Sequence, residues 1–530
     1  MKVTHIPFQK TGFFSKMMLD YLEKNEKITP FYNHFPDFDG FQHQILEKEK
    51  SFDLQTRITL YNELKNQYKS FEVSLKTAEN IELLQAENTF TITTGHQLNL
   101  FTGPLYFLYK ILSTINLCEE LSQKFPNKNF VPIYWMATED HDFDEINYFK
   151  FKGKKVTWNR HDGGAVGRFS MDGLNEVLEV FSAHLGNSKN AVFLKNLFSE
   201  AYLKHKNLAD ATRFIANSLF GEFGLVIIDG DSAPLKKVFS PFVKDELLHQ
   251  TSFKEVSKTI SELEKEYKIQ VNPREINLFY LDQNQRERIV FENGLYKILN
   301  TDIEFSKEEI LEELENHPEK FSPNVLLRPL YQEVILPNLC YIGGGGEIAY
   351  WLQLKQFFGA ISVPFPILLL RNSVQIISTK QFKKLEDLSI SNEEIFLNQH
   401  ALISKKVIEN AAIEIHFGEK KVFLQHQFSE LKEVAKKTDI TFVNAVNAQE
   451  RKQLKGLEML EKRLLKAEKR RQDDLVQRIT SIQNEILPNQ SLEERQRNFS
   501  EYYLEYGQTF MESLKSSLKP LQLEFTILEL

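Results

Sequence analysis

The chain has 530 residues, more than one hydrophobic core usually supports, so we expect two or three domains. Its formal net charge of −8 argues against broad electrostatic binding of nucleic acid, and no run approaches the roughly 20 apolar residues of a membrane span. Two cysteines are too few for a disulfide framework and the N-terminus lacks the apolar core of a signal peptide, so we expect a cytoplasmic protein.

The period of the apolar residues predicts a strand–helix–strand unit. Residues 89–94 are rich in β-branched side chains, Pro104 suits the first position of a helix that runs to about residue 123, and 130–136 is a second apolar strand. Strands joined by one crossover helix are parallel, and ligands bind beyond their carboxyl ends. His96 and the acidic residues after the second strand are therefore expected at a binding cleft.

A second unit of similar form follows, with a helix over 208–220, a strand over 224–228 and a helix from about residue 234. Together with a late strand at 367–370, these elements predict an α/β fold with a Rossmann-like, doubly wound core.

Antiparallel hairpins are expected inside this core at 148–158 and at 289–298, where Asn293-Gly294 is a strong turn signal. We therefore expect a catalytic core over 1–370, with connecting insertions at about 148–205 and 250–320.

Residues 371–530 are rich in Lys, Glu and Gln and predict a helical C-terminal domain. Over 448–487 apolar residues recur at intervals of three, four or their sums, which is typical of a coiled-coil seam, although Arg471 interrupts it. A capping box at 491–494 predicts the start of another helix. The coiled coil could pack within its own chain or serve as a dimer arm, and periodicity does not distinguish the two.

Five carboxylates and a histidine directly follow the strand at 130–136, namely Glu139, Asp140, His141, Asp142, Asp144 and Glu145. A charged run is usually a solvated face, but like charges crowded at a strand end raise carboxylate pKa values, and the position favours a site. Such an oxygen-rich set suits Mg²⁺, and the histidine would admit softer ions. Because no recognised metal spacing is met, we predict no metal site.

Three further features are candidates for binding. His96 could donate to a phosphate or carboxylate or could cap the next helix, whose opening at Gly103-Pro104 could hold an anion on its backbone amides. Arg328 lies between apolar residues, where a guanidinium favours a bidentate anionic partner, either a structural carboxylate or a substrate. The glycines at 343–346 permit close approach of a ligand, but they are equally typical of a flexible loop.

Three separated motifs resemble the bacillithiol biosynthesis cysteine-adding enzymes. They are Thr94-Gly95-His96-Gln97 with Thr102-Gly103-Pro104-Leu105-Tyr106, the segment 135–147, and 324–330 with Gly346-Glu347-Ile348-Ala349-Tyr350-Trp351. The resemblance covers the chain from end to end. It implies a Rossmann-like core with connecting insertions and a C-terminal coiled coil that supports a homodimer.

For function, the resemblance implies the last step of bacillithiol biosynthesis, in which cysteine is added to glucosaminyl-malate through an amide bond. It also implies ATP as the co-substrate that activates the cysteine carboxylate, with no tightly bound cofactor. The implied catalytic residues are His96, Asp140, His141 and Asp142, the last three as amine ligands or as a base. Arg328 would hold the malate carboxylates, and the other implied substrate-binding residues are Gln97, Thr102, Gly103, Glu139, Asp144, Asn324, Glu347 and Tyr350.

The core is also similar to that of class I aminoacyl-tRNA synthetases, but two features depart from these patterns. The family often has glutamine where His96 stands, so we expect this imidazole to contact an anion rather than to transfer a proton. The lysine-rich second synthetase motif is not evident at 378–380. Two alternatives stay open: a metal-dependent hydrolase or transferase that uses Asp140, His141 and Asp142 to activate water, and a non-enzymatic scaffold built on the coiled coil.

Overall fold

The computed structural model describes residues 2–160, 163–282 and 284–530, whose contacts divide the chain into two compact units. Unit 1 contains Phe13–Gln375 and Glu493–Leu528, with the N-terminal residues up to Gln9. Unit 2 contains Ile376–Leu492, with Lys10–Gly12 and the last two residues. The stretch 493–528, expected in the C-terminal helical domain, thus returns to unit 1, where the Asn116 amide donates to the carbonyls of Lys515 (2.7 Å) and Leu518 (2.8 Å).

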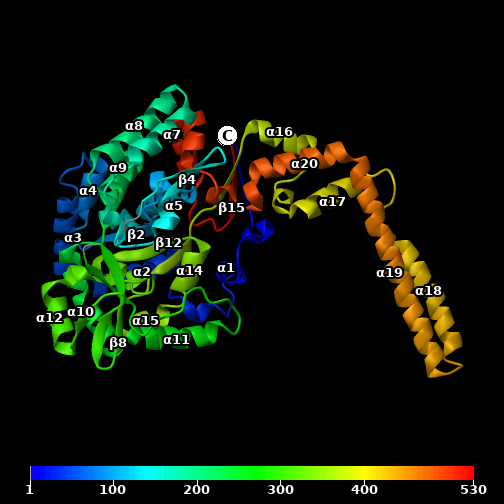
Figure 1. Cartoon of the computed structure of the whole chain (residues 1–530), viewed down its shortest axis with the longest axis horizontal. Helices are drawn as coiled ribbons and strands as arrows, with labels where there is room; N and C mark the ends of the chain where they lie inside the picture. Colours follow the sequence, from blue (N-terminus) through cyan, green and yellow to red (C-terminus); the bar gives the residue numbers. More distant parts are fainter. Residues whose placement is uncertain (1, 161–162, 283) are drawn as a thin grey trace. The chain divides into compact units, whose positions relative to one another are not determined.

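Within the described residues, the central sheet of unit 1 has five parallel strands in the order β13-β12-β2-β3-β6. Their bounds are Ile367–Leu370, Asn338–Gly343, Thr89–His96, Asn129–Met136 and Val226–Asp229. The chain builds outward from β2 through β3 to β6 and then returns to the other side of β2 as β12 and β13 (Figure 1). This order confirms the doubly wound, Rossmann-like fold and places the topological switch point between β2 and β12.

The strands at the switch point are buried on both faces, as parallel strands covered by helices must be. The crossover helix α5 (Tyr106–Lys124) packs on β2 and β3 and begins two residues after Pro104, the predicted first position. Side chains from α5, β2, β12 and β13 form one core cluster that includes Ile92, Leu117, Ile342 and Leu369. Sequence analysis missed β12, because its short apolar run ends in glycines that are equally typical of a loop.

A second sheet of unit 1 is antiparallel, with the order β10-β9-β8-β7-β11. Its bounds are Glu304–Phe305, Leu295–Ile298, Gln285–Glu292, Leu278–Asp282 and Phe321–Pro323. The predicted β8–β9 hairpin is confirmed, and its turn residues Asn293 and Gly294 have φ of 55° and 84°, as a type I′ turn requires. The other predicted hairpin is confirmed as β4 (Tyr148–Phe151) and β5 (Lys154–Thr157).

The other elements of unit 1 surround these sheets. A three-stranded sheet has the order β1-β15-β14, with bounds Lys2–Ile6, Phe525–Glu529 and Val374–Ile377, and the boundary between the units falls within β14. The remaining helices are α1 (Lys16–Leu22), α2 (Phe38–Ser51), α3 (Leu54–Gln67), α4 (Leu75–Leu83), α6 (Phe143–Ile146), α7 (Leu174–Leu185), α8 (Lys189–Lys204), α9 (Leu208–Phe220), α10 (Ala233–His249), α11 (Thr251–Leu263), α12 (Lys307–Asn316), α13 (Arg328–Ile335), α14 (Gly345–Trp351), α15 (Lys355–Ala360), α21 (Phe499–Tyr506) and α22 (Gln508–Ser517).

Unit 2 is helical, with α16 (Thr379–Asp387), α17 (Gln399–Glu409), α18 (Gly418–Ala435), α19 (Ile440–Arg471) and α20 (Asp473–Ile486). Helices α18 and α19 lie side by side as an antiparallel hairpin (Figure 1), joined by ion pairs from Lys432 to Glu450 (2.5 Å) and from Lys421 to Glu461 (2.6 Å). Of the described helices of the whole chain, none is both long and apolar enough to cross a membrane.

Two predictions for this region need correction. The single helix expected over 448–487 is two helices, because α19 ends at Arg471, the residue that interrupts the apolar seam. The capping box expected at 491–494 does not start an α-helix; it leads into a short 3-10 turn, and α21 begins only after Asn498, whose side chain caps it. The Glu494 carboxylate is instead bound to Arg371, a partner far away in the sequence.

Candidate functional site

A cavity of about 1000 Å³ lies at the carboxyl ends of β2, β3 and β12. Its volume is large enough for a small-molecule ligand. The predicted site residues that line it are His96, Gln97, Glu139, Asp140, His141, Asn324, Arg328, Glu347 and Tyr350. The described lining of this cavity does not include the predicted residues Thr102, Asp142 and Asp144. Gly103 lines a neighbouring cavity of about 310 Å³.

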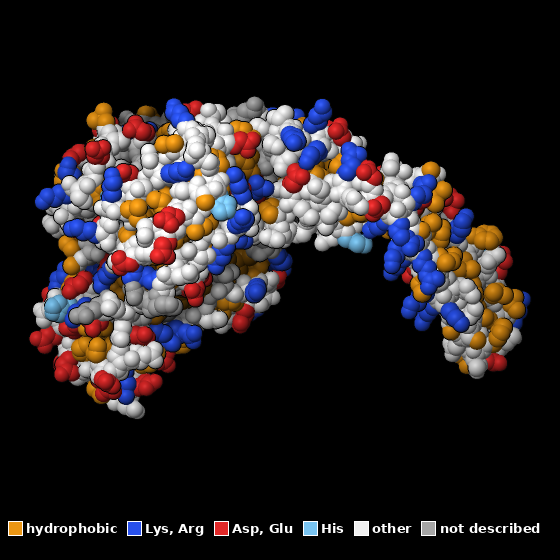
Figure 2. Space-filling view, turned by 45° about the horizontal axis from the view of Figure 1, so that its top comes forward, with side chains coloured by type: hydrophobic (Ala, Val, Ile, Leu, Met, Phe, Trp, Pro, Cys, Tyr) orange, Lys and Arg blue, Asp and Glu red, His pale blue; other side chains and the backbone are white. Residues whose placement is uncertain are grey.

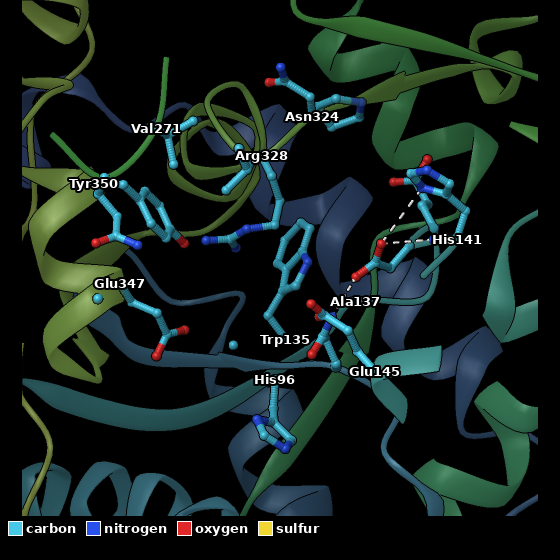
Figure 3. Close-up of a pocket in the computed structure, with 18 of the residues that line it drawn as sticks. His96, Trp135, Ala137, His141, Glu145, Val271, Asn324, Arg328, Glu347 and Tyr350 are labelled. Atoms are coloured by element: carbon cyan, nitrogen blue, oxygen red, sulfur yellow. Dashed lines mark hydrogen bonds and ion pairs between the residues drawn. The ribbon is translucent and has the colours of Figure 1, made fainter. Parts of the chain in front are cut away.

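Arg328 lies among aromatic rings at one end of this cavity. Its guanidinium is 6.0 Å from the ring centroid of Trp135, 5.5 Å from that of Tyr341 and 6.0 Å from that of Trp351. Figure 3 shows it pointing towards Tyr350, above Glu347. Burial by itself would lower the pKa of Arg328, but Tyr350 and Tyr341 raise it above the ordinary value, so the group stays charged.

One nitrogen of Arg328, Nη2, makes no hydrogen bond of regular geometry to a described residue, although the Tyr350 hydroxyl lies beside the guanidinium and helps to raise its pKa. Nη1 donates to Gln332 Oε1 (3.1 Å), whereas Nη2 is buried without a hydrogen bond. An unsatisfied donor of a buried charged group is costly, so a ligand that accepts from Nη2 would be favoured.

The Gln332 amide is held in a defined orientation. Its Nε2 donates to Glu333 Oε1 (2.9 Å), which leaves Oε1 as the acceptor for Arg328. Glu333 also accepts from Asn338 (2.6 Å) and pairs with the buried Lys48 (3.4 Å). This buried network therefore positions Arg328 from behind.

Lys110 and Glu347 form a second buried pair at this end, with Nζ 2.6 Å from Oε2. Lys110 also donates to the Gly95 carbonyl (2.7 Å), and Glu347 accepts from Tyr341 (2.9 Å) and from the Gly344 amide (2.8 Å). Burial would raise the pKa of Glu347, but Lys110 keeps it below the ordinary value. We call the part of the cavity formed by Lys110, Arg328, Glu347 and Arg371 the arginine end.

His96 is at the carboxyl end of β2, but its ring contacts Phe107 and Tyr106, with centroids 5.0 Å and 5.4 Å away. In Figure 3 the imidazole points away from Arg328 and Asn324. Burial, together with Lys110 and Arg371, lowers the pKa of His96 well below its ordinary value, so the ring is neutral. Its Nε2 has no hydrogen bond to any described residue, and the ring packs as a core residue beside the cavity.

The other end of the cavity carries carboxylates. Gln97 Nε2 donates to both Asp140 Oδ2 (2.9 Å) and Glu145 Oε2 (2.8 Å). Asp140 Oδ1 accepts from the backbone amide of His141 (2.8 Å). We call the part formed by Gln97, Glu139, Asp140, His141 and Glu145 the acidic end.

The tautomer of His141 follows from its partner. Nδ1 lies 2.9 Å from Arg286 Nη1, and since a guanidinium can only donate, Nδ1 accepts and the neutral ring carries its proton on Nε2. Burial and then Arg286 lower the pKa of His141 below the ordinary value. The ring is therefore suited to donate a hydrogen bond from Nε2 rather than to act as a base.

Glu139 is tied to cations beneath the acidic end. It pairs with the buried Lys236 (2.5 Å), which also contacts Asp231 (3.3 Å), and Asp231 holds Arg168 through both carboxylate oxygens (2.7 and 2.8 Å). Burial raises the pKa of Glu139. Glu139 is thus part of a structural network of ion pairs, and it also lines the cavity.

Asp142 and Asp144 are exposed on the turn around α6 and do not reach the cavity. Within the described residues, no group of three or more His, Cys, Asp or Glu side chains is arranged to hold a metal ion. Asp140 faces the Gln97 amide, and His141 faces an arginine, which would repel a cation.

The loop before α5 is held by protein contacts. The Asn498 amide donates to the carbonyls of Phe101 (2.8 Å) and Gly103 (2.6 Å), and the Leu105 amide donates to the Arg497 carbonyl (2.9 Å). One amide expected to hold an anion at this helix start is therefore occupied. Gly103 has φ of 61° with its Cβ position blocked by Asn99, so the turn itself explains this glycine. Thr102 is buried in the loop with φ of 69°, and its Oγ1 has no hydrogen bond to a described residue.

Two family models match the chain almost completely. The model described as the bacillithiol biosynthesis BshC N-terminal Rossmann-like domain matches residues 1–372, and the model for the BshC C-terminal coiled-coil domain matches residues 374–530. The chain belongs to the BshC family.

Curated relatives of this BshC family member extend over nearly its whole length. A protein of Flavobacterium johnsoniae named "Putative cysteine ligase BshC" is 58% identical over 523 residues, covering 99% of both chains. One of the same name from Christiangramia forsetii is 53% identical, covering 100% of this chain and 99% of its own. A solved structure titled as a putative arginyl-tRNA synthetase from Campylobacter jejuni covers 84% of this chain and 98% of its own at 10% identity, but its TM-score of 0.21 is too low for any argument.

Sequence analysis of this BshC family member missed several charged residues that line or support the cavity. They are Lys110, Arg286, Arg371 and Lys236. Lys110 could have been found by the argument used for Arg328, because it is a single charge in an apolar helix, YFLYKILSTINLC. Arg286 and Lys236 lie in polar stretches, where nothing in the sequence marks them as buried.

Proposed function

We propose that this protein is an ATP-dependent ligase that joins the carboxylate of cysteine to the amine of glucosaminyl-malate, the last step of bacillithiol biosynthesis. Relatives that match it from end to end carry the name cysteine ligase, which supports the cysteine substrate. The observation that carries the acceptor substrate is the unpartnered Nη2 of Arg328 inside an aromatic wall. A malate carboxylate is an anion that would complete this group.

The reaction needs activation of cysteine, because an amine does not displace hydroxide from a carboxylate in water at a useful rate. ATP would convert the carboxylate into an acyl adenylate with release of pyrophosphate, or into an acyl phosphate with release of ADP. The acceptor amine then attacks the acyl carbon, loses a proton, and expels AMP or phosphate as the amide forms. Both routes balance, and they differ in the nucleotide released.

The two ends of the cavity suit the two kinds of group in these substrates. At the arginine end, Arg328 would bind malate while Trp135 and Tyr341 exclude water, which strengthens the charge-assisted hydrogen bond. At the acidic end, Asp140 would accept from an amine and take its proton during attack. His141 would orient the substrate by donating from Nε2, since its Nδ1 is occupied.

The direct test supplies the purified protein with cysteine, glucosaminyl-malate and ATP and follows bacillithiol and nucleotide by mass spectrometry. We expect bacillithiol with AMP or ADP in equal amount, AMP indicating the adenylate and ADP the acyl phosphate. A matched reaction without ATP should yield none. Absence of bacillithiol with all three substrates would refute the proposed function.

We also propose that the protein is a homodimer through the α18–α19 hairpin. The hairpin has its own small core of Phe428, Ala435 and Val446, so its two helices do not need a second copy to pair. It nevertheless exposes large apolar side chains, which Figure 2 shows in orange, including Val422, Phe423, Val434, Ile440, Met459 and Leu460. Burying such a surface in a second hairpin would be favourable.

Light scattering after gel filtration tests the dimer. The wild-type chain should elute with twice the mass of 62.0 kDa, and Phe423→Glu with Val434→Glu should convert it to a monomer. The exposed Leu75→Glu in α4, a change of the same kind in unit 1, is the control and should remain dimeric. A monomeric wild-type protein would refute this arrangement.

A further inference from the structure

A second buried arginine, Arg371, borders the arginine end. It follows directly on β13, is 3% exposed and lines the same cavity as Arg328. Ligands of a doubly wound sheet bind beyond the carboxyl ends of its strands, and Arg371 follows the carboxyl end of β13, the neighbour of β12.

The guanidinium of Arg371 is held on one side by a returning segment of the chain. Nη2 and Nη1 donate to the two carboxylate oxygens of Glu494 (2.7 and 3.0 Å), and Nη1 also donates to the Asn372 carbonyl (3.0 Å) and to Ser373 Oγ (3.1 Å). Glu494 is 1% exposed. These bonds fix the plane of the guanidinium and use its terminal nitrogens.

The remaining donor, Nε, is buried and has no hydrogen bond to any residue that the structure describes. It lies in the cavity wall beside Gly344, where an ideal Cβ would be 3.8 Å from Nε and 3.5 Å from Glu347 Oε2. On the Arg328 side, an added Cβ on Gly95 would lie 3.8 Å from Nη1 and only 3.2 Å from the Tyr341 hydroxyl, so that position is tight. Both arginines line the cavity, and each keeps one nitrogen without a hydrogen bond to a described residue.

The charges at this end also favour an anion. Lys110, Arg328 and Arg371 carry three positive charges, which Glu347 and Glu494 only partly neutralise. Burial would lower the pKa of Arg371, but Glu494 keeps it above the ordinary value, so the arginine stays charged. An uncompensated positive charge in a poorly solvated site is stabilised by an anionic ligand.

We propose that Arg371 Nε, held in place by Glu494, is a substrate-binding donor for an anionic oxygen that lies over Gly344, beside the group bound by Arg328. The chemistry is that of a phosphate or a carboxylate. The phosphate or carboxylate could belong to ATP, cysteine or glucosaminyl-malate, and this choice of ligands rests on the proposed function. The binding of an anion between the two arginines is a separate claim that holds or fails without turnover.

Isothermal titration calorimetry with each of the three compounds alone tests this inference. Arg371→Lys keeps a charge that can still reach Glu494 but has no N–H at the Nε position. Loss of one charge-assisted hydrogen bond should weaken the binding of at least one compound by about 10-fold to 100-fold. The compound affected identifies the source of the anion. Unchanged binding of all three, within twofold, would overturn the inference.

Two further variants separate a binding defect from a folding defect. The double variant Arg371→Met with Glu494→Gln removes every side-chain donor at position 371 without leaving a buried lone charge, and it should show the same loss with a preserved circular dichroism spectrum. Arg57→Lys changes an equally buried arginine whose terminal nitrogens donate to the carbonyls of Leu84 and Glu87 (both 3.2 Å), away from the cavity, and it should bind like wild type. Equal losses in Arg57→Lys and Arg371→Lys would refute the inference.

The outcome stays distinct from that of the ligase assay. If no bacillithiol forms but Arg371→Lys weakens the binding of ATP, the anion site stands and the proposed function falls. If bacillithiol forms and Arg371→Lys binds all three compounds normally, the function stands and the anion site falls.

Discussion

The two ends of the cavity hold their charges in different ways. At the arginine end, Arg328 and Arg371 are enclosed by rings and backbone, and each has one buried nitrogen without a hydrogen bond to a described residue. At the acidic end, Asp140 and Glu145 share the Gln97 amide, and Glu139 is paired with Lys236. An isolated charge in apolar sequence was thus the better sign of a buried donor at the cavity wall, whereas the charges of the acidic end are paired with other protein groups.

The largest effect is expected behind the arginine end, where Lys48 and Glu333 form a buried pair. Lys48→Met should lower the free energy of unfolding by about 3–5 kcal/mol, because the buried Glu333, whose pKa burial already raises, loses its cationic partner and must stay unpaired or take up a proton. The measurement is urea denaturation. Adding Glu333→Gln should restore part of the loss, and a double variant no more stable than Lys48→Met would argue against a paired role for these groups.

Among the residues of the cavity, substitution of Arg328 should cause the largest loss of kcat/KM. Arg328→Gln is expected to lower kcat/KM for glucosaminyl-malate by about 30-fold to 1000-fold, the usual cost of removing one partner of a desolvated charge pair. Arg328→Lys should recover little, since a lysine cannot reproduce the planar guanidinium. If both variants keep kcat/KM within threefold of wild type, the arginine end does not bind the acceptor.

At the acidic end, the neighbours Asp140 and Asp142 provide a matched pair of substitutions. Asp140→Asn should lower kcat by about 100-fold if this carboxylate takes the amine proton. Asp142→Asn should change kcat less than about threefold, because Asp142 is exposed and does not line the cavity. Equal effects in steady-state kinetics would show that the acidic run acts as a whole, as the sequence first suggested.

The smallest effect concerns Asp229, at the end of β6 beneath the acidic end. Burial and Asp231 raise its pKa from the ordinary 3.8 to about 6. Between these two pH values the folded state holds a proton that the unfolded state has released. This contribution to stability is complete below the pKa of the unfolded chain and is lost as the pH rises through about 6. The free energy of unfolding should therefore decrease by roughly 1 kcal/mol from this group between pH 5 and pH 7.5.

Asp229→Asn should abolish that part of the pH dependence. The measurement is urea denaturation of both proteins at the two pH values. The amide oxygen of the asparagine can still accept from Thr138 and from the Asp231 amide, so the variant should fold. An identical pH dependence in the two proteins would show that Asp229 does not hold the proton.

The sequence placed residues at the cavity where they project from the end of a periodic element. The ends of β2 and β3 placed Gln97 and Asp140 at the cavity, and Arg328 was found by its apolar neighbours. Asp142 could not be separated from Asp140, because which of two adjacent carboxylates faces inward depends on the turn that follows β3. His96 was expected to face a ligand, but its ring packs against Phe107.

By itself, the sequence determined strands β2, β3, β6 and β13, the crossover helices and both hairpins, because the period of apolar residues and the turn residues act over a few positions. Only the tertiary structure decided that β12 lies beside β2, that α19 pairs with α18, and that Glu494 reaches Arg371. These contacts join residues distant in the chain, and their free energy comes from burial and from satisfying buried charges, which no local pattern records.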